Sequence, residues 1–349
     1  MGENRNDLKM KDKIILITDL REDKKLKVNI RFYQALGLDY LLLRPFERLD
    51  EKELEGLFSL NHFYEKNGLG LVVSFHIGTV MAKLLGEDPL NIDFADPKIR
   101  QGLYHFISYL IKHGIKAFDF CGLESLAIGE RDLLEACREL NKNTFFNKKV
   151  LAMAEIYPSQ KTQIALANPN FSALSLVRSK GEIGNLFKFS RDFADAGAGL
   201  ALSFSNFPKK GINFENYPQA AKRLILMTLF FLKGTLFIEE NRLDFNDIEF
   251  LRALFALKEK IQNLEKMTKI LPKEADVLAF IREGEGKKIL YMANFSEKEV
   301  LLDLAYKVMD YKDYDFLAGS LTHRTLYRTT LLRPYEAIVF QNCKYFERM

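Results

Sequence analysis

Short apolar runs alternate with amphipathic stretches between residues 13 and 266. Eight of these runs are rich in β-branched and aliphatic residues: 13–18, 38–45, 69–75, 115–120, 150–155, 171–177, 199–205 and 234–239. Continuous apolar runs of this length are typical of parallel strands that are buried on both faces. The pattern therefore predicts eight buried strands.

The stretches between the runs carry helix signals at their ends. Residues 50–68 begin with acidic residues and end on Asn67-Gly68, and residues 96–114 begin with Asp96-Pro97 and end on a glycine. The final helix is predicted over 247–266. Eight strand and helix pairs predict a (β/α)₈ TIM barrel. An open doubly wound sheet is the alternative, but no G-x-G-x-x-G motif follows the first strand.

The pattern changes after Pro272. Residues 277–304 predict a hairpin with its turn at 283–286 and then a further strand, and residues 327–341 predict two more strands. Residues 309–319 predict a polar loop between strands. We therefore expect a barrel over 1–270 and a small C-terminal antiparallel β-sandwich over 271–349.

Composition excludes several classes of protein. Of the 349 residues, 48% are hydrophobic and 28% charged, as in soluble globular proteins. The net charge of +4 comes from interspersed charges, which argues against a nucleic-acid surface. Three scattered cysteines and the absence of a phosphate loop predict no metal and no cofactor. The chain shows no signal peptide, and its longest apolar stretch, 224–232, is far below the roughly 20 residues of a membrane span, so we expect a cytoplasmic protein.

Several blocks, in the right order, resemble the α-amylase superfamily, the family 13 glycoside hydrolases. Residues 199–245 look like the seventh strand and helix and the eighth strand of that family, and residues 96–120 look like its third helix and nucleophile strand. Residues 277–304 and 331–340 are similar to its C-terminal sandwich. The resemblance implies a family 13 barrel that lacks the long domain usually inserted after the third strand.

The resemblance also implies where the chemistry would lie. Retaining hydrolysis uses two carboxylates about 5–5.5 Å apart. The family motif Phe-Arg-x-Asp falls on residues 118–121, so Cys121 replaces the nucleophile and Asp119 replaces the arginine. Alternation puts Asp119 and Cys121 on one face of the strand, with the carboxylate displaced by about 6.6 Å. Glu155 falls on the retained acid/base position.

The remaining candidates are binding residues. Asn206, Phe207 and Pro208 stand where the family has Asn-His-Asp, and His76 lies near the end of the third strand but not at the family histidine's position. Each candidate also has a structural interpretation. Glu155 would be an inherited carboxylate with a local partner, Asp119 an ion-pair partner, Cys121 a buried apolar thiol, and His76 a hydrogen-bonded structural group.

Three functions stay open at this point. The leading hypothesis is a catalytically inactive member of the superfamily that acts as a binding, scaffold or regulatory protein. The alternatives are a divergent α-glucoside hydrolase or transglycosidase that uses Glu155, and a non-catalytic oligosaccharide sensor. The candidate partners are an α-glucan or oligosaccharide, a protein partner and a second copy of the chain, with no nucleic acid and no membrane. The absence of tryptophan weighs against both sugar-based alternatives.

Overall fold

The chain forms two compact units, which are described separately. In the computed structural model the first unit comprises the described parts of 1–176, 193–203 and 234–246, and the second those of 177–192, 204–233 and 247–349. The described residues are 14–19, 29–44, 50–122, 126, 136, 139–145, 150–155, 171–174, 199–203, 218–232, 234–239, 247–270, 276–304, 308 and 310–342.

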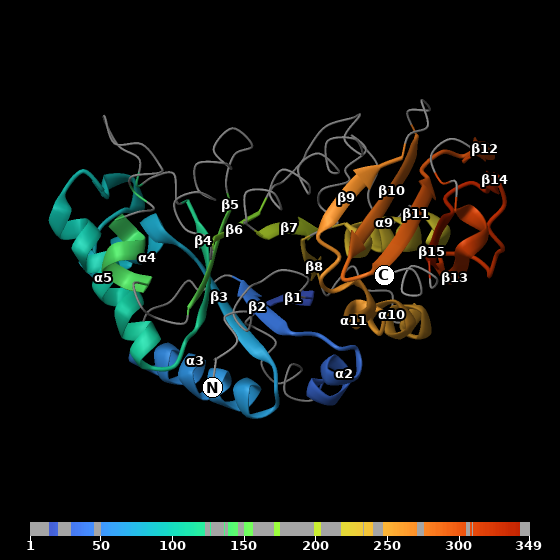
Figure 1. Ribbon diagram of the computed structural model, residues 1–349. Coiled ribbons are helices and arrows are strands. Elements are labelled where there is room, and N and C mark those ends of the chain that lie inside the picture. Colours follow the sequence, from blue (N-terminus) through green and yellow to red (C-terminus); the bar gives the residue numbers. More distant parts are fainter. Residues whose placement is uncertain are drawn as a thin grey trace. The chain divides into compact units, whose positions relative to one another are not determined.

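The first unit is a closed barrel of eight parallel strands in sequential order, with the first strand paired to the eighth (Figure 1). This confirms the predicted TIM barrel and excludes an open sheet. Each predicted apolar run overlaps one strand. The strands are β1 (Ile14–Asp19), β2 (Tyr40–Arg44), β3 (Gly70–His76), β4 (Ala117–Cys121), β5 (Leu151–Glu155), β6 (Phe171–Leu174), β7 (Gly199–Ser203) and β8 (Thr235–Glu239). Strands β1, β3 and β4 extend one residue beyond their runs.

Two helices of the first unit, α3 (Glu51–Lys66) and α5 (Pro97–Lys112), begin and end at the predicted signals. The unit also contains α2 (Ile30–Ala35) and α4 (Ile77–Leu85), with the short turns η2 (Pro89–Asn91) and η4 (Asn141–Phe145). Asp50 Oδ1 accepts the backbone N–H of Glu53 at the start of α3. Beyond the end of α5, Gly114 has a positive φ of 95°, which favours glycine.

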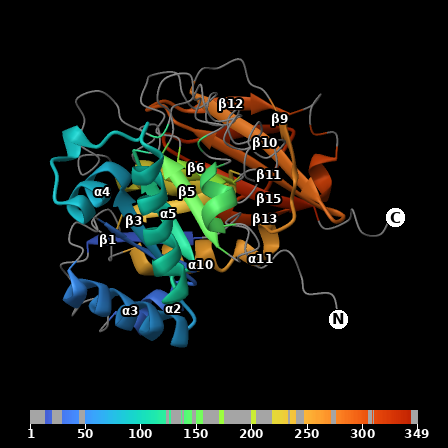
Figure 2. The ribbon, with the colours of Figure 1, turned by 90° about the vertical axis from the view of Figure 1, so that its left-hand side faces the viewer.

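Aromatic packing joins β3 and β4 to α5. The ring of Phe75 meets those of Phe118 and Phe120 edge-on and also contacts Phe106 of α5. Figure 2 views the barrel from the side on which α4 and α5 lie. The buried Phe118 and Phe120 therefore take the helix-facing side of β4, as alternation predicts, which leaves Asp119 and Cys121 on the other side.

The second unit contains an antiparallel sandwich. Its larger sheet has the order β13-β15-β11-β10-β9 and its smaller sheet pairs β12 with β14. The strands are β9 (Lys266–Lys269), β10 (Val277–Gly284), β11 (Lys287–Asn294), β12 (Val300–Asp303), β13 (Tyr314–Gly319), β14 (Thr329–Leu332) and β15 (Ala337–Asn342). Leu302 and Leu332 of the small sheet share one apolar core with Leu290 and Phe340 of the large one. This confirms the predicted C-terminal fold, including the hairpin at Glu285-Gly286.

Helix α9 (Gln219–Phe231) packs against this sandwich, and α10 (Ile248–Phe255) and α11 (Lys258–Ile261) belong to the same unit. The buried hydroxyls of Thr228 and Tyr291 lie 2.5 Å apart, and the ring of Phe231 contacts that of Tyr291. Burial raises the pKa of Tyr291, so it stays a neutral phenol. None of the helices within the described ranges is both long and apolar enough to cross a bilayer.

The prediction of one helix over 247–266 is wrong. Helix α10 ends at Phe255, α11 ends at Ile261, and the chain then turns through Asn263, with φ of 68°, into β9. Two residues of β10 hold the turn that follows α11. The fully buried Arg282 donates to the carbonyls of Leu264, Ile261 and Phe231 at 3.1, 3.4 and 3.2 Å. Gly284 lets the backbone of Asn263 come close, since an added Cβ would meet its carbonyl oxygen at 2.1 Å.

The predicted polar loop over 309–319 is also wrong. Residues Tyr311–Asp313 form the short turn η10 and Tyr314–Gly319 form strand β13, which pairs with β15. Tyr314 is buried in the sandwich core and Phe316 packs partly against it, so the segment places its aromatic side chains inward. The sheet itself begins with β9 at Lys266, and the division of the chain at residue 270 stays a prediction.

Candidate functional site

The best-described part of the candidate site lies where β3 and β4 run side by side. In this parallel pair Ser74 is opposite Asp119 and His76 is opposite Cys121. Both strands end at these residues, so the four side chains lie in the last layers of the barrel before its carboxyl-terminal mouth. Active sites of TIM-barrel enzymes lie at that end.

The side chain of Asp119 is buried within the barrel. It is 0% exposed, and Oδ2 accepts a hydrogen bond of 2.7 Å from the Ser74 hydroxyl. The Ser74 oxygen also lies 3.8 Å from the Cys121 sulfur. Because the hydroxyl proton is directed to Asp119, the serine oxygen presents its lone pairs to Cys121 and can accept a hydrogen bond from the thiol. The Ser74 hydroxyl therefore links the Asp119 carboxylate to the Cys121 thiol.

His76 is the exposed member of the group. Its ring lies over Gly122, where an added Cβ would be 2.4 Å from the ring Nε2, and near Gly78, where the closest ring atom would be at 3.4 Å. Gly122 also has φ of 75°, in the left-handed region. A glycine directly after β4 therefore provides the room that the imidazole occupies.

We expect Gly122→Ala to displace the His76 ring and to lower the free energy of unfolding by about 1–2 kcal/mol, the cost of left-handed backbone for a residue with a Cβ. Gly86→Ala is the matched control, since Gly86 has φ of 71° and an added Cβ would meet nothing within 4 Å. Both variants should lose similar stability in urea denaturation, and only Gly122→Ala should shift the His76 ring protons in NMR spectra. An unchanged His76 spectrum would contradict the placement of the ring.

The other predicted site residues are described less fully. Glu155 is the last residue of β5, where its backbone pairs with Leu174, and its side chain lies outside the described residues. Asn206 and Phe207 lie entirely outside them. The structure thus brings His76, Asp119 and Cys121 together and leaves the roles of all six residues as proposals. Within the described ranges, no group of three histidine, cysteine or acidic side chains could hold a metal ion.

Sequence reasoning missed Ser74, which joins Asp119 to Cys121. The only signal is a hydroxyl residue inside the apolar run 69–75, next to a strand that also carries a polar residue in an apolar run. Two polar residues opposite each other in neighbouring buried strands are expected to be hydrogen-bonded, because an unpaired polar group is costly there. The register between the two strands, however, is not readable from either run alone.

Comparison with known proteins identifies the fold. Residues 267–319 match the family described as the C-terminal domain of maltogenic amylase. The fold resembles trehalose-6-phosphate hydrolase from Bacillus licheniformis, with a TM-score of 0.76 and 11% identity over 95% of this chain and 99% of that chain. It also resembles the trehalulose synthase MutB from Pseudomonas mesoacidophila, with a TM-score of 0.75 and 12% identity over 95% and 98% of the two chains. No curated protein matches the chain in sequence.

These matches confirm the resemblance to the α-amylase superfamily at the level of the fold and of the C-terminal domain. At 11–12% identity the structural likeness carries the fold alone. Function has to be argued from the site, because one barrel fold supports many activities and also supports proteins without any.

Proposed function

We propose that this protein has the family 13 fold without ordinary glycosidase activity and acts as a binding, scaffold or regulatory protein. The observation that carries the proposal is the burial and hydrogen bonding of Asp119. It is the acidic residue of β4, it is fully buried, and it accepts a hydrogen bond from Ser74. A carboxylate in that position cannot approach an anomeric carbon in the mouth of the barrel.

The group at the end of β4 supports the same proposal. Cys121 is partly exposed and stands where the resemblance implies a nucleophilic aspartate. Its neighbour Ser74 lies 3.8 Å from the sulfur and, as a neutral hydroxyl, is not a base that would activate the thiol. A protonated thiol is a poor nucleophile, since thiolates are the reactive form of cysteine. Loss of a covalent nucleophile typically costs several orders of magnitude in rate.

One comparison supports a sugar sensor as the second candidate. The structure of an inactive double mutant of the trehalulose synthase was determined in complex with isomaltulose. In that protein, sugar binding therefore survives the loss of activity. By analogy, this chain would bind an oligosaccharide at the mouth of its barrel without turning it over, and Glu155 and His76 would be the polar groups nearest to it. The divergent enzyme that uses Glu155 is the outcome that the following experiment is designed to detect.

We expect the full-length protein to show no hydrolysis or transfer on a panel of α-glucosides that includes maltodextrins, trehalose 6-phosphate and sucrose. Product formation should stay at the level of a Glu155→Gln variant of the same chain, because a lone acid cannot replace the missing nucleophile. The readout is reducing sugar or released phosphosugar over long incubations. Turnover that Glu155→Gln abolishes would overturn the proposal in favour of the divergent enzyme.

The same panel separates the sensor from the scaffold. A rise in the melting temperature with maltodextrin, without turnover, would support a sugar sensor, because a ligand that binds only the folded state stabilises it by mass action. His76→Ala should then reduce the rise, while the exposed His105 on the outer helix α5 provides a control substitution. No change with any sugar would leave the protein-binding role as the proposed function.

A further inference from the structure

The small sheet of the sandwich is apolar on both of its faces. Its strands β12 and β14 lie side by side (Figure 1), and in this antiparallel pair Leu301 is opposite Leu331. Their neighbours Leu302 and Leu332 lie in the sandwich core, so alternation puts Leu301 and Leu331 on the outer face. These two outer side chains are 63% and 38% exposed. The outer face therefore presents a pair of leucines to solvent.

Tyr327 adds an aromatic ring to this surface. It precedes β14 and is 64% exposed, while its neighbour Leu326 lies in the core. Leu301, Tyr327 and Leu331 are called the outer patch below. The large sheet, by contrast, is covered on both sides, by the sandwich core and by α9. Single exposed apolar residues are common on protein surfaces, but a cluster of them on one sheet face marks an interaction site.

A long ion pair borders the outer patch. Asp303 is the last residue of β12, Arg328 directly precedes β14, and Arg328 Nε lies 3.9 Å from Asp303 Oδ1. The two side chains are 59% and 62% exposed, so the pair adds less than about 1 kcal/mol to the stability of a single chain. Each charge can therefore exchange its neighbour for an opposite charge on another molecule at little cost. The patch is thus flanked by one charge of each sign, on different strands.

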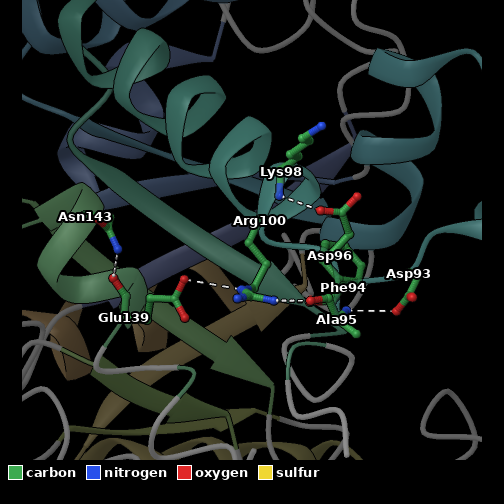
Figure 3. A network of polar contacts seen from close by, with 8 residues as sticks. All are labelled: Asp93, Phe94, Ala95, Asp96, Lys98, Arg100, Glu139 and Asn143. Carbon is green, nitrogen blue, oxygen red and sulfur yellow. Dashed lines mark hydrogen bonds and ion pairs between the residues drawn. The ribbon is translucent and has the colours of Figure 1, made fainter.

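Another exposed apolar cluster lacks this balance of charge. Three leucines between residues 84 and 90 are exposed, but residues 86–96 contain four acidic residues and no basic one. Arg100 binds the end of this segment, where its Nη1 donates to the carbonyls of Phe94 and Ala95 at 2.7 and 2.8 Å (Figure 3). Two copies of this acidic segment would repel each other, so it is not suited to pair with itself.

We propose that the outer patch docks on the same patch of a second copy of this chain. A two-fold axis that runs parallel to the strands, between β12 and β14, brings Leu301 of one copy against Leu331 of the other. The same axis brings Asp303 of each copy to Arg328 of the other, because the two charges lie on different strands. Such a contact is isologous and closes at a dimer. The patch itself carries both halves of the charge complementarity that the contact needs.

Sedimentation velocity of the full chain over a concentration series tests the proposal. The inference goes beyond the proposed function, because association can be measured whether or not the protein binds a sugar. The weight-average mass should rise from 40.4 kDa with concentration and level off at twice this value. Leu301→Asp should raise the concentration needed by about tenfold or more, as expected for a central apolar anchor. A wild type that stays monomeric, or that grows beyond a dimer, would overturn the proposal.

Leu90→Asp is the matched control for Leu301→Asp. Leu90 is 93% exposed and lies in the acidic segment of the first unit, so its substitution should leave association unchanged. Urea denaturation at concentrations where the chain is monomeric separates association from folding. Both variants should unfold like the wild type there, because both side chains are largely exposed. An equal loss of association in the two variants would contradict the role of the outer patch.

Charge exchange distinguishes the two-fold contact from other arrangements. Asp303→Arg alone and Arg328→Asp alone should each weaken association, because each places like charges across the interface. An equimolar mixture of the two variants should recover it, because one chain of each kind restores two pairs of opposite charge. A contact between the patch and a different surface of the second copy would not be restored in this way. A mixture that associates no better than either variant alone would therefore overturn the proposal.

Discussion

Replacement of Arg282 by methionine lowers the free energy of unfolding of the second unit by about 3–5 kcal/mol. Arg282 is fully buried, and its guanidinium donates to three carbonyls, two of which belong to the last residues of α9 and α11. Carbonyls at a helix end have no partner within the helix, and burial away from water makes each unsatisfied one costly. Methionine fills most of the volume and supplies no donor.

Urea denaturation followed by tyrosine fluorescence measures this effect, since the chain has 14 tyrosines and no tryptophan. Arg328→Met is the control: Arg328 is largely exposed and pairs with Asp303 at 3.9 Å, so its loss should cost less than about 1 kcal/mol. Arg282→Lys should be intermediate, because an ammonium group keeps the charge but cannot reach three separate carbonyls. Equal stability of Arg282→Met and Arg328→Met would show that the buried guanidinium does not hold the helix ends.

The second large effect is expected at Gly284. An added Cβ would lie 2.1 Å from the carbonyl oxygen of Asn263 and 3.1 Å from the Cα of Leu264, and backbone atoms cannot rotate away as a side chain can. Gly284→Ala should therefore cost stability near the upper end of the about 1–3 kcal/mol that is typical of overpacking. Gly56→Ala in helix α3, where an added Cβ meets nothing within 4 Å, should be neutral or slightly stabilising.

The two substitutions should not be additive. Arg282 binds the carbonyl of Leu264, and Gly284 accommodates the residue before it, so both act on the same turn of the chain. Once Gly284→Ala has moved this turn, Arg282→Met should cause a smaller further loss of stability. A double-mutant cycle should therefore show a coupling energy within the about 0.5–3 kcal/mol that is typical of residues in contact. Additive losses would mean that the two residues stabilise separate parts of the unit.

The barrel was predictable because its strands are buried on both faces. Such strands appear in the sequence as continuous apolar runs, and residues such as Asp96 and Gly114 mark the helix ends between them. The prediction of one helix over 247–266 was wrong because the local sequence pattern is helical throughout this stretch. The turn that ends α11 before residue 266 is held by Arg282 and Gly284, which lie beyond it in the sequence. Local patterns contain no information on such distant contacts.

The candidate site was predictable only in part for the same reason. Side-chain alternation along β4 predicted that Asp119 and Cys121 lie on the same face, and this prediction needs the sequence of one strand only. The serine that bonds to Asp119 is 45 residues away, and only the register of β3 against β4 makes it a partner. Likewise, an exposed leucine such as Leu90 is indistinguishable in the sequence from a buried one. The partner of Asp119 and the exposure of Leu90 are both set by the tertiary structure.

The hydrogen bond between Ser74 and Asp119 also bears on how this face of the barrel would tolerate a second carboxylate. Cys121→Asp alone would add a second carboxylate on the same face, beside a serine whose only hydroxyl proton is already donated to Asp119. Two carboxylates on the same face of one strand repel each other, so Cys121→Asp alone would be destabilising. Residue 119 would have to change first or at the same time. The buried pair thus couples the effect of a substitution at residue 121 to the identity of residue 119.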